Sequence, residues 1–175
     1  SQDALLPHRL FVLLLQTIFF ETMAIILIPV DSSTHSEYCL DFYIKQLHRE
    51  GNHVFSVYVG DYYGDVGVLE GPTPGRIQEL EQEDRLKSAQ IEEHVLQVLK
   101  ENNITGTFKR VLGKDVWHTI VEYSKTIKAD MIVLGSRGMG KIRRTILGSV
   151  SESVLHHSHI PVLICKHPHH TSHHH

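Results

Sequence analysis

A glycine-rich, cationic segment between residues 135 and 150 has the residue types and spacing that best fit a chemical task. It follows the apolar run 131–134 and leads into 149–152, which indicates the start of a helix. Its spaced glycines are Gly135, Gly138 and Gly148. Glycines between a strand end and a helix N-terminus allow backbone N–H groups to approach and bind an anion. Four cations lie in the same segment: Arg137, Lys141, Arg143 and Arg144. The expected ligand therefore carries phosphate.

Three phosphate-binding motifs compete for this segment. Gly135 to Lys141 fits part of a Walker A loop, but Ile142 stands where a Ser or Thr would bind Mg²⁺. Gly138-Met139-Gly140 begins a dinucleotide fingerprint, but Arg143 occupies the position of the third glycine. The third pattern fits without a gap: Gly135, two residues, Gly138, nine residues, and then Gly148-Ser149.

The elements that must position this segment alternate between strand-like and helix-like patterns. Apolar runs predict five strands, at 24–28, 53–59, 107–112, 131–134 and 161–165. Helical spacing predicts a helix that begins with a capping box at Thr34-x-x-Glu37 and ends at Gly51-Asn52, a long helix up to Asn102-Asn103, and shorter helices at 116–127 and 149–156. Residues 60–75 indicate a long loop. This alternation predicts an α/β fold: a single doubly wound domain whose five-stranded parallel sheet has helices on both faces.

Three segments, taken together, resemble the universal stress protein family in its ATP-binding branch. They are the glycine pattern, Ile28-Pro29-Val30-Asp31-Ser32-Ser33, and Ile160-Pro161-Val162-Leu163-Ile164. The resemblance covers residues 23–167 and implies the strand order 3-2-1-4-5. In that order, the switch point lies between the first and fourth strands, where ligands bind outside the carboxyl ends of the strands. Asp31 and Gly135 follow those two strands.

The resemblance also implies roles for individual residues. The main chain of Val59 matches the position that binds the adenine edge, and Val30 is an apolar neighbour of the ring. Asp31 and the backbone of Gly135 match the ribose contacts, while the start of the last helix matches the phosphate contacts. The expected ligand is ATP, with or without Mg²⁺. The full set of expected nucleotide contacts is Pro29, Val30, Asp31, Val59, Leu134, Gly135, Arg137, Gly138, Gly148, Ser149 and Val150.

Two of these residues have structural alternatives. Ser149-x-x-Glu152 is itself a capping box, so Ser149 could serve only its own helix. Asp31 could be a helix-flanking residue that is stabilised by the dipole of the next helix.

The sequence favours a binding module over an enzyme. Phosphoryl transfer needs a positioned metal and a group that orients the nucleophile. The segment 135–150 contains no Asp, Glu or His, so Asp31 and the acidic loop 61–70 are the only nearby carboxylates. We therefore expect an ATP-binding regulatory module of the stress response with little or no turnover and no catalytic residue. The alternative is a slow ATPase or phosphotransferase that uses the same crevice.

Composition sets the broad class. The chain has 175 residues, 41% of them hydrophobic, and a formal net charge of −3, so no basic excess points to nucleic acid. Cys39 and Cys165 lack metal or redox spacing, which favours a reducing, cytoplasmic location.

Two segments are expected to lie outside the domain. The apolar run 10–20 is too short to span a membrane, and we assign residues 1–22 to an extension outside the domain. Residues 168–175 form a tail typical of a purification tag. An apolar edge strand at 161–165 predicts a homodimer.

Overall fold

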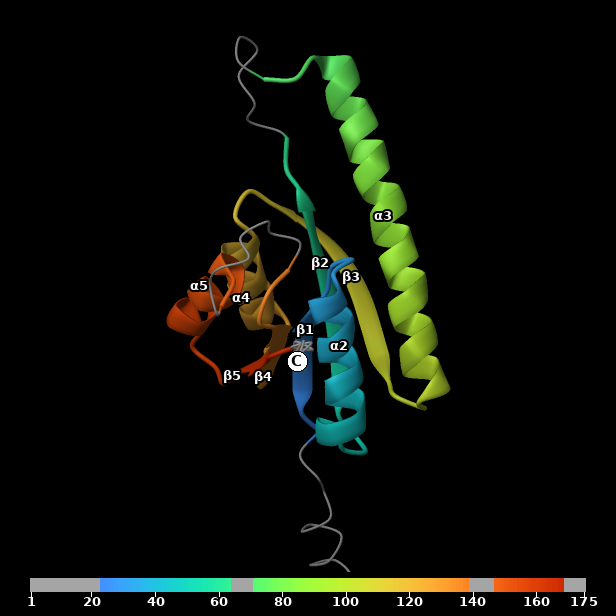
Figure 1. The fold of residues 1–175 in the computed structure, drawn as a ribbon, viewed down its shortest axis with the longest axis vertical. Helices are drawn as coiled ribbons and strands as arrows, with labels where there is room; N and C mark the ends of the chain where they lie inside the picture. The colour runs from blue at the N-terminus through green and yellow to red at the C-terminus, as the bar shows by residue number, and fades with distance from the viewer. Residues whose placement is uncertain (1–22, 64–70, 139–146, 169–175) are drawn as a thin grey trace, which may run out of the picture.

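Five parallel strands form one sheet in the order β3-β2-β1-β4-β5 (Figure 1). The computed structural model describes residues 23–63, 71–138 and 147–168. The strands are β1 (Ile25–Pro29), β2 (His53–Asp61), β3 (Gly106–Gly113), β4 (Met131–Gly135) and β5 (Val162–Cys165). The predicted fold class and strand order are confirmed.

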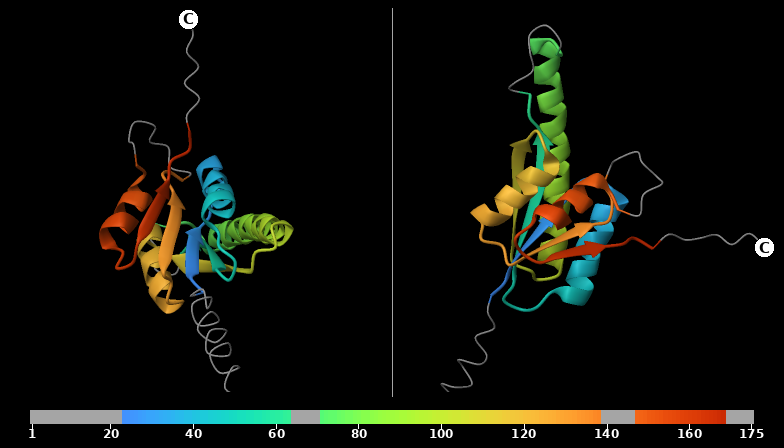
Figure 2. Two further views of the ribbon diagram at one scale, coloured as in Figure 1. Left: turned by 90° about the horizontal axis from the view of Figure 1, so that it is seen from below. Right: turned by 90° about the vertical axis from the view of Figure 1, so that its left-hand side faces the viewer.

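Helices cover both faces of the sheet, and each face has its own core (Figure 2). On one side α2 (Thr34–Phe42), the π-helical turn η2 (Tyr43–Leu47) and α3 (Pro74–Glu101) pack on Ile26 and Ile28 of β1. On the other side α4 (Val116–Thr126) and α5 (Ser149–His157) pack on Leu27. Successive residues of a strand point to opposite faces, so an uninterrupted apolar β1 can serve both cores.

One predicted helix start differs from that in the structure. Ser33, not Thr34, caps α2: its side chain accepts a hydrogen bond from the N–H of Ser36. The last helix, α5, begins at Ser149 as predicted, with Gly148 as the residue before it. Helix boundaries often shift by a residue or two from the most obvious capping residue. The first helical segment also ends earlier than predicted, at Leu47 rather than at Gly51.

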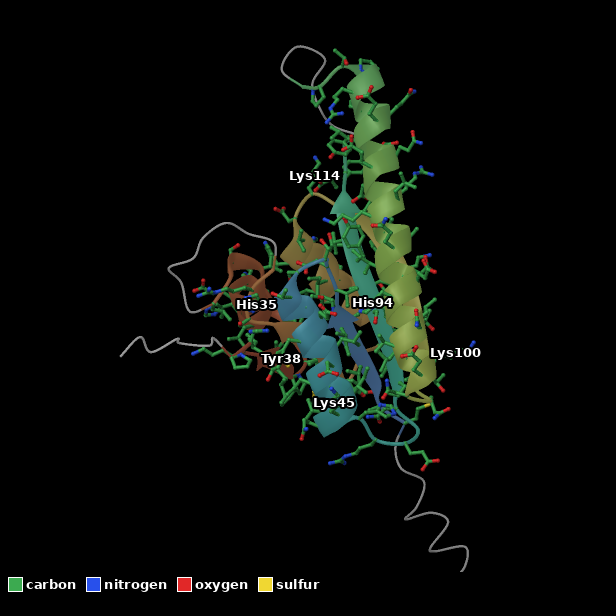
Figure 3. The ribbon with its side chains drawn as sticks, turned by 45° about the vertical axis from the view of Figure 1, so that its right-hand side comes forward. His35, Tyr38, Lys45, His94, Lys100 and Lys114 are labelled. Carbon is green, nitrogen blue, oxygen red and sulfur yellow. The ribbon has the colours of Figure 1, made fainter. Side chains whose placement is uncertain are left out.

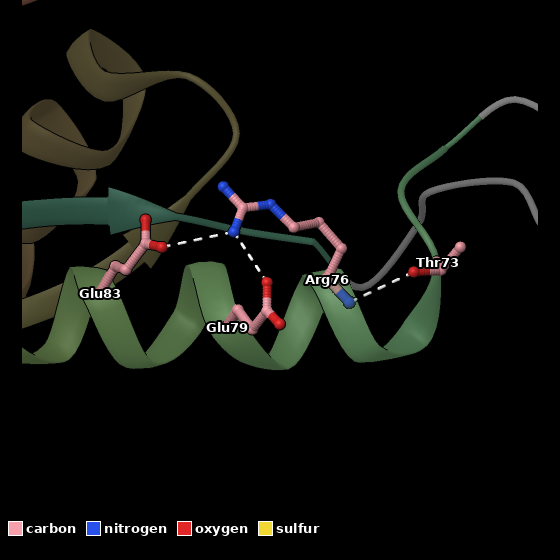
Figure 4. Close-up of polar contacts among 4 residues, drawn as sticks. All are labelled: Thr73, Arg76, Glu79 and Glu83. Atoms are coloured by element: carbon pink, nitrogen blue, oxygen red, sulfur yellow. Dashed lines mark hydrogen bonds and ion pairs between the residues drawn. The ribbon is translucent and has the colours of Figure 1, made fainter.

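The long helix α3 extends well past the end of the sheet (Figure 1). Thr73 caps it by accepting a hydrogen bond from the N–H of Arg76, and Pro74 occupies its first turn. The guanidinium of Arg76 pairs with Glu79 at 2.8 Å and with Glu83 at 3.4 Å, which connects successive turns of the exposed end (Figure 4). Although α3 is long, none of the described helices is apolar enough over a sufficient length to cross a membrane.

Strands β1 and β2 differ in length, and this difference creates the site. Their pairing ends at Pro29 and Val57, whereas β2 continues to Asp61 beside β3. The last residues of β2, after Val57, therefore pair with β3 on one side and with no described strand on the other. The predicted loop 60–75 is shorter than expected, because β2 runs to Asp61 and α3 begins at Pro74. Several predicted features lie outside the described residues: the apolar run 10–20, residues 64–70 of that loop, the cations Lys141, Arg143 and Arg144, and the end of the tail.

Candidate functional site

A cleft of about 440 Å³ lies at the carboxyl ends of β1, β2 and β4 and reaches the start of α5. This is the switch point of the sheet, since the chain leaves β1 and β4 toward opposite faces. The structure brings together every residue in the predicted set of nucleotide contacts. The cleft is lined by Pro29, Val30, Asp31, Val59, Leu134, Gly135, Arg137, Gly138, Gly148, Ser149 and Val150, among others.

Asp31 is oriented by the turn that precedes α2. Its Oδ1 accepts a hydrogen bond from the N–H of Ser33 at 2.8 Å, and its own N–H donates to Oγ of Ser36 at 3.0 Å. Ser36 is buried, so this turn is anchored in the core. The second carboxylate oxygen, Oδ2, faces Gly138: a Cβ added at that glycine would lie 2.7 Å from it. The carboxylate is thus aimed into the cleft and toward the glycine-rich segment.

Gly135 has a packing role that its place in the motif did not predict. A Cβ at this position would lie 2.8 Å from the carbonyl oxygen of His35 in α2. Its own carbonyl accepts a hydrogen bond from Oγ of the buried Ser151 at 2.8 Å. This glycine therefore allows β4 to end directly between α2 and α5, and it brings the two sides of the cleft together.

The start of α5 lies at the other end of the cleft, which its first-turn residues Ser149 and Val150 line. The N–H of Gly148 donates to the carbonyl of Ser136 at 2.8 Å, so the two ends of the glycine-rich segment are joined at its base. Gly148 has no side chain with which to cap α5, and first-turn N–H groups of a helix lack partners within it. Ser149 is not the N-cap, so the capping-box alternative for this residue was wrong. The geometry suits an anion at this helix end.

Val59 offers main-chain groups to the cleft. The N–H of Val30 donates to the carbonyl of Val57, and the N–H of His53 donates to that of Ala24, so odd-numbered residues of β2 direct these groups toward β1. In a parallel strand the N–H and C=O of one residue point to the same side. Because the pairing with β1 ends at Val57, the N–H and C=O of Val59 face the cleft.

No sequence pattern predicted the polar cluster on the wall of the cleft nearest α3. Asp84 accepts hydrogen bonds from the hydroxyl of Tyr58 at 2.6 Å and from Nε of Arg110 at 2.8 Å. Burial and the Asp84 carboxylate hold the pKa of Tyr58 well above its ordinary value, so this hydroxyl stays protonated. Lys87, one turn after Asp84, lines the cleft, and its Nζ lies 5.7 Å from the centre of the Tyr58 ring. The position of Lys87 depends on how α3 packs against the sheet, which no local sequence motif encodes.

Two further carboxylates line the cleft beside Asp31: Asp61 at the end of β2, and Glu152 in the first turn of α5. They could approach a metal that is bound to a ligand. Within residues 23–63, 71–138 and 147–168, no three His, Cys, Asp or Glu side chains are grouped as a metal site by themselves.

A second cavity of about 300 Å³ lies between α2 and α3 and shares Asp31, Ser36 and Lys87 with the cleft.

Comparison with known proteins shows which protein family has this sequence pattern. The sequence model of the universal stress protein family matches residues 23–166. The chain belongs to the universal stress protein family. A universal stress protein of Methanocaldococcus jannaschii is 30% identical over 143 residues, which is 82% of each chain.

Solved structures of universal stress proteins share the fold. The protein UspA of Lactobacillus plantarum superposes with a TM-score of 0.68 at 24% identity, covering 81% of this chain and 96% of that one. A family member from Arabidopsis thaliana, solved with AMP bound, has a TM-score of 0.62 at 17% identity, covering 83% of this chain and 92% of its own.

Proposed function

We propose that this universal stress protein binds an adenine nucleotide, ATP in particular, and acts as a regulatory module with little or no turnover. The observation that carries the proposal is the convergence of Asp31, Val59 and the three spaced glycines on one cleft. These residues come from three strand ends and one helix start. The AMP bound to the Arabidopsis relative agrees with this ligand class.

The cleft has one group for each part of a nucleotide. Asp31 can accept hydrogen bonds from the ribose hydroxyls, and such charge-assisted bonds are stronger than neutral ones. The N-terminus of α5 and Arg137 can receive the phosphates. Between them, Val30 and Leu134 are buried apolar residues that can contact the face of the base.

Val59 gives a reason to expect adenine rather than guanine. Adenine has an acceptor nitrogen beside its exocyclic amino donor, which matches a main-chain N–H and C=O from one residue. On the corresponding edge of guanine, donor and acceptor exchange places, so the same two groups would meet like partners. A mismatched buried pair costs about 1–3 kcal/mol for each unsatisfied group.

Low turnover is supported by the orientation of one carboxylate of the cleft, Asp31. The other two described carboxylates of the cleft are Asp61, at the end of β2, and Glu152, in the first turn of α5. Asp31 is already engaged by Ser33 and aimed at Gly138, which suits a ribose contact better than a metal or a nucleophilic water.

Titration calorimetry of the nucleotide-free protein with ATP, AMP and GTP tests the proposal. We expect ATP and AMP to bind and GTP to bind at least about tenfold more weakly, a difference of about 1.4 kcal/mol. Failure to bind ATP would overturn the assignment of the site. Phosphate release in the presence of Mg²⁺ at about 1 s⁻¹ or faster, within the usual range of enzymes, would favour the ATPase alternative.

We also propose a homodimer formed through β5. This strand is at the edge of the sheet, no other described strand pairs with its outer side, and Val162, Leu163 and Ile164 are only half-buried. Unpaired edges are templates for pairing, and an antiparallel contact would satisfy both copies equally. Light scattering at micromolar concentration should give twice the mass of the chain, and a monomer would exclude this arrangement.

A further inference from the structure

The fold brings the two cysteines of the chain together. Cys39 lies in α2 and Cys165 ends β5, yet both belong to the same core cluster and are almost fully buried. Each thiol is the largest influence on the pKa of the other, and this interaction raises the pKa of Cys39 and lowers that of Cys165. Sequence spacing predicts neither a redox nor a metal role, because the pair forms only when α2 docks on the sheet.

Independent contacts place α2 over the ends of β4 and β5. The ring of His167, two residues after Cys165, lies 5.3 Å from the ring of His35 and 5.0 Å from that of Tyr38. Both of these α2 residues lie on its first two turns (Figure 3). Gly135, which pairs in register with Cys165, meets the backbone of His35. The proximity of the two sulfurs therefore agrees with the packing around them.

Each cysteine belongs to an element that supports one end of the cleft. Cys39 lies one turn after Ser36, whose Oγ accepts the N–H of Asp31. The carbonyl of Cys165 accepts the N–H of Ser136, which in turn accepts the N–H of Gly148. A covalent bond between the two sulfurs would thus connect the support of Asp31 to the base of the glycine-rich segment.

We propose that Cys39 and Cys165 form an oxidation site for a hydroperoxide, closing to an intrachain disulfide that weakens nucleotide binding. Cys165 reacts first, because it ends the four-residue strand β5 and is followed by the exposed Lys166, so peroxide can reach it from the end of the strand rather than across the edge that the proposed dimer would pair. Local opening of a strand end costs far less than global unfolding. The interaction with Cys39 lowers the pKa of Cys165 and burial opposes this, so the net direction favours the thiolate of Cys165 over that of Cys39.

The chemistry balances with hydrogen peroxide as the oxidant. The sulfur of Cys165 attacks one peroxide oxygen: an S–O bond forms, the O–O bond breaks, and the other oxygen leaves as water. The sulfur of Cys39 then attacks that of Cys165; the S–S bond forms, the S–O bond breaks, and a second water leaves. Two thiols lose two electrons and two protons, and the peroxide is reduced to two waters.

The disulfide should change the cleft because its S–S bond, about 2.05 Å, is far shorter than a contact between two thiols. Closing it draws α2 toward β5 and shifts Asp31 relative to Gly148. Misalignment of converging groups lowers affinity, so we expect the oxidised protein to bind ATP several-fold more weakly. This last step rests on the proposed nucleotide site, whereas formation of the disulfide does not.

The experiment treats the full chain with hydrogen peroxide, then alkylates free thiols under denaturing conditions without reductant. The expected product is a monomeric chain lighter by two hydrogens, with no alkylation, and a peptide map that joins residues 39 and 165. Cys39→Ala and Cys165→Ala are matched controls, since each keeps one thiol and cannot form the intrachain bond. Calorimetry with ATP, before oxidation, after it, and after reduction, measures the coupling.

The outcomes are distinct. Complete alkylation of both thiols after peroxide, or a bond between two chains instead, would overturn the oxidation site. Intrachain bond formation with unchanged ATP affinity would overturn the coupling. If the reduced protein does not bind ATP, the proposed function fails, while the mass measurement still decides whether the disulfide forms. Mapping the bond on wild-type protein keeps the test decisive even if an alanine variant folds poorly.

Discussion

The two ends of the cleft are built for recognition in opposite ways. At the end that we assign to the ribose, a side chain would make the contact: Asp31, whose carboxylate is oriented by the N–H of Ser33. At the end that we assign to the phosphates, the contact surface would be backbone, exposed by the absence of side chains at Gly138 and Gly148. Binding at the first end should be lost when the Asp31 side chain is removed, whereas binding at the second should be lost when a side chain is added to a glycine. Replacement by alanine, which adds only one methyl group to a glycine, therefore tests the first end fully and the second only in part.

The two ends also differ in how they tolerate a methyl group. At Gly135 an added Cβ meets the backbone of His35 at 2.8 Å, whereas at Gly148 the nearest atoms are 3.4 Å away. The first glycine is required by the folded chain itself. The second is open in the free protein, so its role is best tested with ligand.

The largest effect is expected from Gly135→Ala. The added methyl would push α2 away from β4, and overpacking of this kind costs about 1–3 kcal/mol. Thermal unfolding should shift to lower temperature, and nucleotide binding should be lost with it. Gly75→Ala is the matched control, because a Cβ there meets nothing within 4 Å. An unchanged melting temperature for Gly135→Ala would show that α2 is free to move.

Next in size is Gly148→Val, which sharpens the comparison by affecting binding without folding. Gly148 has φ −76° and ψ 152°, an extended conformation that any residue adopts. The melting temperature should stay near that of wild type, while ATP affinity falls more than tenfold, or about 1.4 kcal/mol. AMP, with one phosphate, should lose less. Equal losses for ATP and AMP would contradict the assignment of α5 to the phosphates.

Asp31→Ala tests the end that depends on a side chain. Loss of a charged hydrogen-bonding group costs about 1.5–3 kcal/mol, and at the lower end of this range affinity should drop about tenfold for ATP, ADP and AMP alike. The matched variant Asp31→Asn keeps an acceptor for the N–H of Ser33 and should recover part of the loss. A deficit that grows with the number of phosphates would place Asp31 at the wrong end of the ligand.

Arg137→Gln should have a smaller effect, because this half-buried cation at the rim supplements the backbone donors. We expect ATP to weaken a few-fold and AMP hardly at all, with the difference shrinking at high salt as the charge is screened. Lys100→Gln, an exposed change on α3, controls for net charge. If both variants behave alike in calorimetry, Arg137 makes no specific contact.

Deleting residues 1–22 should have the smallest effect. The described strands and helices begin at Ile25 and form the sheet, both cores and the cleft among themselves. We therefore propose that residues 23–167 suffice for folding and for both ends of the cleft. Loss of ATP affinity or of cooperative unfolding in the truncated protein would assign the extension to the domain.

Local sequence patterns predicted most of the fold, and the family resemblance named the residues that the structure gathers at the cleft. Strand ends and glycine spacing are encoded within a few neighbouring residues, and the parallel α/β arrangement follows from their alternation. Lys87, Tyr58 and the cysteine pair escaped prediction because they meet only through the docking of α3 and α2. The ion pair of Arg110 with Asp84, which spans 26 residues of sequence, has the same origin. The start of α2 moved by one residue because Ser33 and Thr34 are both suitable capping residues.

Because β1 ends early, a bound nucleotide would complete part of the sheet. With Val59 facing an empty place in the ladder, a base that bonds its N–H and C=O would extend the sheet by one rung. The ligand would then act as a piece of the strand that the chain does not supply. Amide hydrogen exchange would record this directly: the N–H of Val59 should exchange quickly in the free protein and slowly with ATP. The amide of Val57, already beside β1, serves as the internal reference.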